Sequence, residues 1–242
     1  MGCAPATTTA GELAQLYADP PDGIRVNMIM STDGATEFDG RAGPLSDSCD
    51  QNLLLALRGY ADAVLVGAGT ARAERYGPVR LTAEQRAERH HPRAVTDIPP
   101  IAVVTRSGVL PASLFAEPAQ RPLVITTAET ARTHHQLLRR ADLLVAGDSE
   151  VDLRAAVDGL RARGMRHILC EGGPILLDEL IAEDLVDEMC LTVSPTMAGT
   201  KPSAHPGAPA LRTPARLVLS HAITVEDYVY LRYRRADPTA GQ

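Results

Sequence analysis

The sequence contains no tryptophan, and aromatic residues make up only 3% of its 242 residues. Proteins that bind single-stranded nucleic acid stack bases on aromatic side chains, so the composition disfavours that class. Lys201 is the only lysine, and the net charge of −6 is opposite in sign to the basic excess of general nucleic-acid-binding domains. A local anion pocket remains possible, but its charge must come from arginine.

Long apolar runs are also missing. No stretch of about 18 apolar residues exists, so no membrane-spanning helix is predicted. Residues 1–7 lack the basic and apolar regions of a signal peptide, and Ala6 stands where a myristoylation motif requires Ser or Thr. We therefore expect a cytoplasmic protein without a membrane partner.

The cysteines are few and widely separated. Cys3, Cys49, Cys170 and Cys190 form no C-x-x-C pair and have no histidine at metal-ligand spacing. We expect them to be reduced and mostly buried, and we predict no metal site.

Apolar segments of strand length alternate with amphipathic segments of helix length through most of the chain. This alternation predicts an α/β fold with a mainly parallel sheet covered by helices on both faces. The C-terminal strand-like segments have no helices between them, so we expect an antiparallel edge there. Strands are predicted at 24–30, 63–66, 100–104, 123–126, 143–145, 168–170, 189–193, 216–221 and 225–233. Helices are predicted at 11–17, after a cap at Ser46 or Asp47, after 126 through 138, at 153–163 and from Pro174. Loops are predicted at 82–96, with part of that segment helical, and at 196–214.

Glu171-Gly172-Gly173-Pro174 joins a buried strand to an amphipathic helix. Adjacent glycines let a ligand approach the backbone, and Pro174 suits the first position of a helix. Free N–H groups at such a helix start form an anion site. The same residues also fit a simple strand-to-helix turn.

Other strands end in similar sequences. Gly67-Ala68-Gly69-Thr70 follows the second predicted strand, and Asp33-Gly34 follows the first. Thr70 also fits a helix cap, and Asp33 also fits a residue that fixes a turn.

In order along the chain, Ser31-Thr32-Asp33-Gly34, Leu57-Arg58, Val66-Gly67-Ala68-Gly69-Thr70, Glu171-Gly172-Gly173-Pro174, Leu185-Val186-Asp187-Glu188 and Ser194-Pro195 resemble the RibD C-terminal domain, the reductase domain of riboflavin biosynthesis. The resemblance covers about residues 24 to 235 and implies a dihydrofolate reductase-like fold. We therefore expect one reductase domain at 23–236, preceded by a tail and short helix at 1–22 and followed by a tail at 237–242.

The resemblance implies an NADPH-dependent oxidoreductase. Its expected reaction reduces the ribosylamino group of a phosphorylated pyrimidine, 5-amino-6-ribosylaminouracil 5′-phosphate or its 2,5-diamino analogue, to a ribitylamino group. The cofactor carries the hydride, so the protein mainly has to hold it against the substrate. The implied cofactor contacts are a pyrophosphate cradle of Gly67, Ala68, Gly69, Thr70, Gly172, Gly173, Pro174 and Ile175, with Thr105, Arg106 and Ser107 at the adenosine 2′-phosphate.

The implied substrate contacts are less specific. Arg58, Val79 and Arg80 match family positions near the substrate, Glu171 matches an acidic residue there, and Arg41 is a weaker phosphate candidate. Asp33 and Glu171 are the candidate catalytic acids. Arg58 also fits a surface ion pair, Arg106 a solvated loop arginine, and Glu171 a residue that ties down a turn.

The chain departs from the family after Thr70. Many members have Asp-Asp-Pro or Asp-Asn-Pro there, whereas this chain has Glu74-Arg75-Tyr76-Gly77-Pro78, in which Glu74 replaces the first acid. Nothing resembles the zinc deaminase signature of bifunctional members. We therefore expect a stand-alone reductase. The family resemblance implies a homodimer.

Two alternatives remain open. Asp50 lies on the helix where dihydrofolate reductase carries its pterin-binding carboxylate, so dihydrofolate is a second candidate substrate. A non-catalytic nucleotide-binding paralogue would bind NADPH without turnover.

Overall fold

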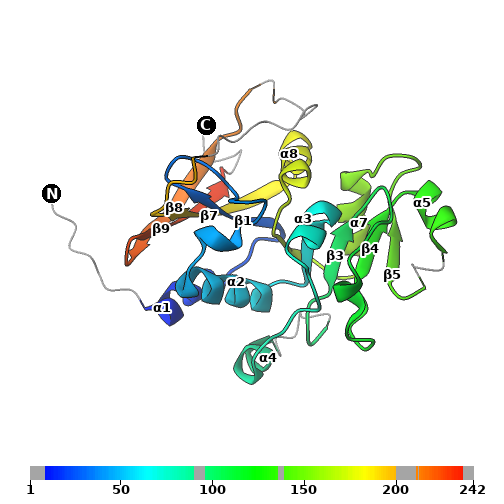
Figure 1. Ribbon diagram of the computed structural model, residues 1–242, viewed down its shortest axis with the longest axis horizontal. Helices are drawn as coiled ribbons and strands as arrows, with labels where there is room; N and C mark the ends of the chain where they lie inside the picture. The colour runs from blue at the N-terminus through cyan, green and yellow to red at the C-terminus, as the bar shows by residue number, and fades with distance from the viewer. Residues whose placement is uncertain (1–8, 90–95, 136–138, 200–210, 212, 237–242) are drawn as a thin grey trace.

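The computed structural model describes residues 9–89, 96–135, 139–199, 211 and 213–236. Its centre is a nine-stranded sheet in the order β5-β4-β3-β2-β6-β1-β7-β9-β8 (Figure 1). The strands are β1 Gly23–Ser31, β2 Ala63–Gly67, β3 Ile101–Val104, β4 Leu123–Thr126, β5 Asp142–Val145, β6 His167–Cys170, β7 Val186–Ser194, β8 Leu217–Val225 and β9 Tyr228–Arg235. β1 to β7 pair in parallel, while β9 pairs antiparallel with both β7 and β8. The predicted parallel sheet with antiparallel C-terminal strands is confirmed.

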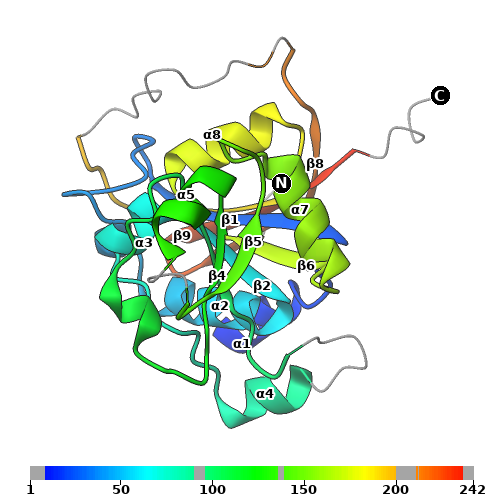
Figure 2. The same ribbon diagram turned by 90° about the vertical axis from the view of Figure 1, so that its right-hand side faces the viewer.

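Helices cover both faces of this sheet, as predicted. Figure 2 shows α1, α2 and α4 on one side and α7 and α8 on the other. The helices are α1 Ala10–Gln15, α2 Ser48–Tyr60, α3 Ala68–Ala73, α4 Ala83–Arg89, α5 Ala128–Thr133, α7 Leu153–Ala162 and α8 Pro174–Ala182, with short 3-10 helices at Gly43–Leu45 and Ala112–Phe115. None of the helices in these described ranges is long and apolar enough to cross a bilayer.

Strand β2 shows how the two layers of core arise. Side chains alternate across a strand, so Val64 and Val66 pack on one face with α1 and α2, and Ala63 and Leu65 pack on the other with α7 and α8. Because both faces are covered, β2 is apolar at every position from 63 to 66.

A buried ion network fixes the N-terminal segment to the sheet. Glu188 on β7 is fully buried, and its carboxylate accepts hydrogen bonds from Arg25, Arg232 and Arg234. Arg25 and Arg232 also donate to backbone carbonyls of the segment after α1, at Tyr17 and Leu16. Burial of three charges is tolerated here because each has a partner.

The structure corrects some predicted boundaries. Residues 225–233 are not one strand, because Glu226 has a left-handed backbone (φ 52°) and turns the chain between β8 and β9. The cap of α3 is Gly67, and Thr70, which also fitted a helix cap, lies inside the helix. The cap of α2 is Asp47, whose side chain accepts from the N–H of Asp50. Cys3, most of the predicted loop at 196–214 and the end of the helix predicted to reach 138 lie outside the described residues.

Candidate active site

A cleft of about 1220 Å³ opens at the carboxyl ends of four neighbouring strands, β3, β2, β6 and β1. Ligands of open α/β sheets bind at this edge. Sixteen of the nineteen predicted site residues line it: Asp50, Arg58, Gly67, Ala68, Gly69, Thr70, Glu74, Arg80, Thr105, Arg106, Ser107, Glu171, Gly172, Gly173, Pro174 and Ile175.

The two predicted halves of the pyrophosphate cradle lie side by side because β2 and β6 are hydrogen-bonded neighbours. The N–H of Gly67 donates to the carbonyl of Gly172 at 2.9 Å. Helix α3 begins directly after Gly67, and α8 begins directly after Gly173. The first N–H groups of each helix have no partner within the helix and can bind an anion.

Glycine is required in the second half of the cradle. Gly172 has a φ of +86°, which favours glycine. A Cβ at Gly173 would lie 2.6 Å from Oγ1 of Thr70, which accepts the N–H of Gly173 at 3.2 Å. The Thr70 hydroxyl thus links the two halves of the cradle.

The third strand end carries the predicted 2′-phosphate residues. The Thr105 side chain accepts the N–H of Gly108 at 3.0 Å and closes the turn after β3. Arg106 is exposed, and its Nη1 lies 2.9 Å from Oε1 of Glu150 and 3.0 Å from Oε2. The predicted phosphate-binding cation is therefore paired with a carboxylate on the loop after β5.

Arg58 and Glu171 form the most constrained ion pair in the cleft. Nε and Nη2 of Arg58 each donate to one oxygen of Glu171 at 2.7 Å, and the hydroxyl of Tyr76 donates to Oε2 at 2.6 Å. Burial lowers the pKa of Arg58, but the charge and hydrogen bonds of Glu171, together with Tyr76, outweigh it, so the pKa lies above its ordinary value. Burial first and the charge of Glu171 second raise the pKa of Tyr76, which therefore keeps its proton and donates it.

The far end of the cleft holds two polar side chains, Asp50 and Asn27. Asp50 is 8% exposed and accepts a hydrogen bond from the Ser46 hydroxyl at 2.6 Å. Burial raises the pKa of Asp50. Asn27, on β1, also lines the cleft, and its Oδ1 is buried without a hydrogen-bond partner in the described part of the chain.

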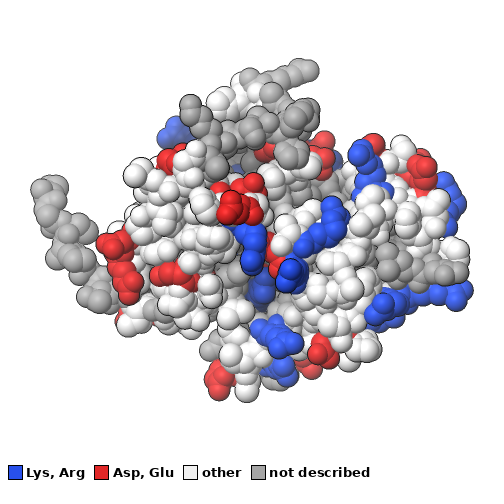
Figure 3. All heavy atoms as spheres, in the orientation of Figure 1, with Lys and Arg blue, Asp and Glu red and all other residues white. Residues whose placement is uncertain are grey.

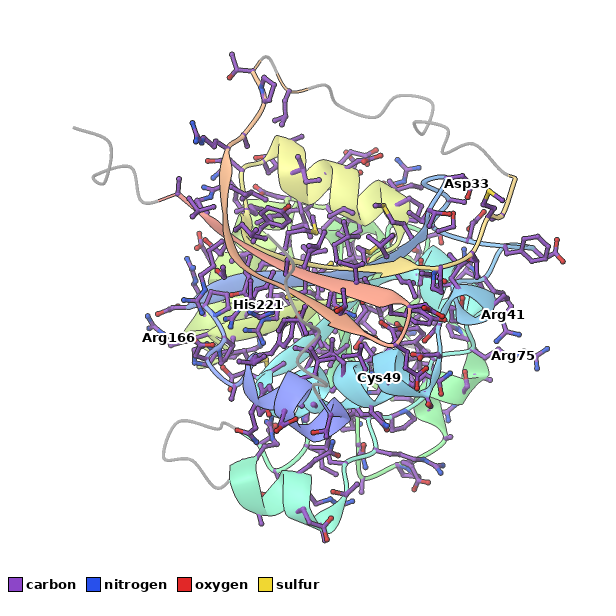
Figure 4. The ribbon with its side chains drawn as sticks, turned by 90° about the vertical axis from the view of Figure 1, so that its left-hand side faces the viewer. Asp33, Arg41, Cys49, Arg75, Arg166 and His221 are labelled. Carbon is purple, nitrogen blue, oxygen red and sulfur yellow. The ribbon has the colours of Figure 1, made fainter. Side chains whose placement is uncertain are left out.

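Three predicted site residues do not line the cleft. Val79 is 1% exposed and belongs to the hydrophobic core. Arg41 is exposed and lies 3.4 Å from Glu74, and in Figure 4 it projects outward.

Asp33, the third of these, lies beside the end of β7 (Figure 4). Its carboxylate accepts from the Ser31 hydroxyl at 2.5 Å and from the N–H groups of Ala198 and Gly199 at 3.0 and 2.8 Å. These hydrogen bonds, that of Ser31 first, lower the pKa of Asp33 to about 2.

Sequence reasoning missed Asn27, Arg75, Tyr76 and Glu150, which all line the cleft. Arg75 has a left-handed backbone (φ 52°) and lies near Arg41 in Figure 4. Basic and acidic side chains gather together in the middle of the face drawn in Figure 3. No group of three or more possible metal-ligating side chains occurs in the part of the chain that the structure describes.

The chain matches a known protein family over most of its length. The model of the RibD C-terminal domain matches residues 23–229. The chain belongs to the RibD C-terminal domain family. The predicted family is therefore confirmed, and with it the prediction that the chain is an oxidoreductase.

Two curated proteins and one solved structure that are similar to this chain have names that describe a reductase or a reductase-like protein. The 2,5-diamino-6-ribosylamino-4(3H)-pyrimidinone 5′-phosphate reductase of Archaeoglobus fulgidus is 28% identical over 74% of this chain and 83% of its own length. The protein of the same name from Methanothermobacter thermautotrophicus is 26% identical over 87% of this chain and 96% of its own. A pyrimidine reductase-like protein from Corynebacterium diphtheriae has a TM-score of 0.79 and 29% identity, and the match covers 95% of this chain and 99% of that one.

Proposed function

We propose that this protein uses NADPH to reduce the ribosylamino group of a phosphorylated pyrimidine. The observation that carries the proposal is the order of the strand ends along the cleft. The turn of Arg106 follows β3, the two halves of the cradle follow β2 and β6, and Asn27 lies on β1 next to β6. Adjacent strands lie about 4.8 Å apart, so a dinucleotide laid across them would have its 2′-phosphate, pyrophosphate and nicotinamide in that order.

The cradle fits a pyrophosphate. The first N–H groups of α8 after Pro174 have no partner within the helix, and the absence of a Cβ at Gly173 lets the Thr70 hydroxyl of α3 approach the start of α8. A bound nicotinamide would supply the hydride, and the protein would supply orientation and exclude water.

The Arg58–Glu171–Tyr76 cluster and Asn27 are the proposed substrate contacts. Glu171 has both oxygens hydrogen-bonded, which fixes its orientation. The unpaired Oδ1 of Asn27 suits an N–H or amino donor of a pyrimidine, because a buried acceptor without a partner is costly. Arg75 and Arg80 are exposed cations at the cleft, and they are the candidates for the ribose phosphate.

Asp50 favours dihydrofolate as a second candidate substrate. Its buried carboxylate lines the cleft on the helix where the sequence placed it. The Asp50→Asn variant should abolish any reduction of dihydrofolate and leave reduction of a ribosylaminopyrimidine phosphate within about threefold, because the amide keeps a similar shape.

The experiment is to follow NADPH oxidation by the purified chain with the aminated and deaminated ribosylaminopyrimidine phosphates and with dihydrofolate in parallel. Turnover of one pyrimidine phosphate would support the proposal and identify the order of deamination. Turnover of dihydrofolate alone would move the activity to the second candidate. NADPH binding with no turnover of any of the three would favour the non-catalytic paralogue.

A further inference from the structure

Arg106 is the only one of the three predicted 2′-phosphate residues that carries a charge, and it already forms an ion pair with Glu150. Its Nη1 contacts both oxygens of Glu150, at 2.9 and 3.0 Å. Both side chains line the cleft and are mainly exposed, at 68% and 74%. The pair therefore lies where a dinucleotide's adenosine end would lie if the proposed function holds.

The loop that carries Glu150 is held in place. The carbonyl groups of Gly147 and Asp148 accept the N–H groups of Ala128 and Glu129 at the start of α5, and Asp152 caps α7. Gly147 has a φ of +88°, and a Cβ there would lie 2.1 Å from the carbonyl oxygen of Glu150. Glu150 is thus presented to Arg106 by a turn with little freedom.

A second acidic residue lies at the same end of the cleft. Glu179 on α8 also lines it, and burial first and the charge of Glu150 second raise the pKa of Glu179 above its ordinary value. The charge of Arg106 thus lies near two carboxylates, those of Glu150 and Glu179.

We infer that Glu150 is a specificity-determining residue that weakens the preference for NADPH over NADH by competing with the 2′-phosphate for Arg106. This inference rests on the proposed function. The 2′-phosphate carries close to two negative charges, so its approach to Arg106 requires that the Arg106–Glu150 pair open, and it is repelled by the Glu150 carboxylate. NADH has a hydroxyl at that position and meets neither cost.

Two effects of Glu150 oppose NADPH binding, the cost of opening the Arg106–Glu150 pair and the repulsion between Glu150 and the 2′-phosphate. An exposed ion pair contributes little, so opening it should change affinity by about fivefold at most. Repulsion between the carboxylate and the phosphate adds to the cost of opening the pair. Neutralising Glu150 should therefore raise the affinity for NADPH by about three- to tenfold. NADH affinity should change by less than about twofold, since NADH has no phosphate at this position.

The test is calorimetric titration of the purified full chain with NADPH and with NADH, for the wild type and for Glu150→Gln. Glu183→Gln is the matched control, because Glu183 also forms an exposed pair with an arginine, Arg154 at 2.8 Å, but lies outside the cleft lining. We expect the ratio of the NADH to the NADPH dissociation constant to rise about three- to tenfold in Glu150→Gln and to stay unchanged in Glu183→Gln.

A double variant tests the route through Arg106. In the Arg106→Gln background, Glu150→Gln should raise NADPH affinity by only about twofold, because only the direct repulsion between Glu150 and the 2′-phosphate is removed. If Glu150→Gln raises NADPH affinity equally in the wild-type and Arg106→Gln backgrounds, the inference that Glu150 competes for Arg106 is overturned. If NADPH binds the wild type and Glu150→Gln leaves the ratio unchanged, the role of Glu150 is wrong and the proposed function stands. If neither cofactor binds the wild type, the proposed function itself fails.

Discussion

Arg58 and Glu171 face each other across the cleft through two hydrogen bonds of 2.7 Å, although they lie 113 residues apart in the sequence. The pair joins α2 to the turn after β6, and Tyr76 adds a third hydrogen bond from the loop after α3. Its side chains are 18% and 3% exposed, so neither partner could stay charged here at low cost without the other.

Breaking this pair should destabilise the fold. Arg58→Met leaves the Glu171 carboxylate buried and unpaired, so the free energy of unfolding should fall by about 3–5 kcal/mol in a denaturant titration. Arg154→Met, which breaks an exposed pair, should cost less than about 1 kcal/mol. The double variant Arg58→Met/Glu171→Met should recover most of the stability and no activity. Equal losses for the two single arginine variants would contradict the assigned burial of the pair.

Tyr76→Phe removes one hydrogen bond to Glu171 and no charge. If Tyr76 positions that carboxylate, kcat with the pyrimidine substrate should fall about tenfold while KM changes less than about threefold. Tyr228→Phe is the control, because Tyr228 donates its hydroxyl to the carbonyl of Leu45 at 3.1 Å and does not line the cleft. A fall in kcat of the same size in the control would mean that the loss at Tyr76 is general rather than local.

Gly173→Ala should close the cofactor cradle. The added Cβ would lie 2.6 Å from Oγ1 of Thr70, so either the Thr70 side chain or the start of α8 has to shift, and the hydrogen bond between them is lost. We expect the dissociation constant of NADPH to rise more than about tenfold. Gly59→Ala, in α2, has nothing within 4 Å of the added carbon and should leave NADPH binding unchanged. Normal binding by Gly173→Ala would remove this turn from the cofactor site.

Asp33 should contribute to stability rather than supply a proton. Hydrogen bonds from Ser31, Ala198 and Gly199 stabilise its charged form and lower its pKa to about 2, below the ordinary value of about 3.9. This contribution is complete above the unfolded pKa and is lost as pH falls through the folded one.

Asp33→Asn should therefore lower the thermal unfolding midpoint at pH 7, by an amount that shrinks as pH falls below about 4. The N–H groups of Ala198 and Gly199 should exchange faster with deuterium, since they lose a charged acceptor. The acid limb of the pH–rate profile should keep its midpoint. A limb that shifts or disappears in Asp33→Asn would assign a proton-transfer role to Asp33 after all.

Patterns that belong to one strand and its following turn could be predicted from the sequence. The glycine-rich ends of β2 and β6 lie at the cleft, and Asp47 caps α2, because local periodicity and cap chemistry specify both. Contacts between distant turns could not be predicted. Tyr76 meets Glu171 across 95 positions, and Glu150 meets Arg106 across 44, and no local signal links either pair.

The same limit explains why Val79 and Asp33 do not line the cleft. Val79 is an apolar residue, and the hydrophobic core takes it although its neighbour Arg80 lines the cleft. The carboxylate of Asp33 is held by backbone N–H groups about 165 residues further along the chain, which the Asp-Gly turn by itself does not reveal.

The position of β1 also governs when the protein can fold during synthesis. β1 is made well before both of its partners in the sheet, β6 and β7, which come from residues 167–194. At about 5–20 residues per second, the emerging chain spends roughly ten seconds or more with β1 unpaired on both edges. Such high contact order slows folding, so the ribosome-bound chain should depend on holdase chaperones until β7 has left the exit tunnel.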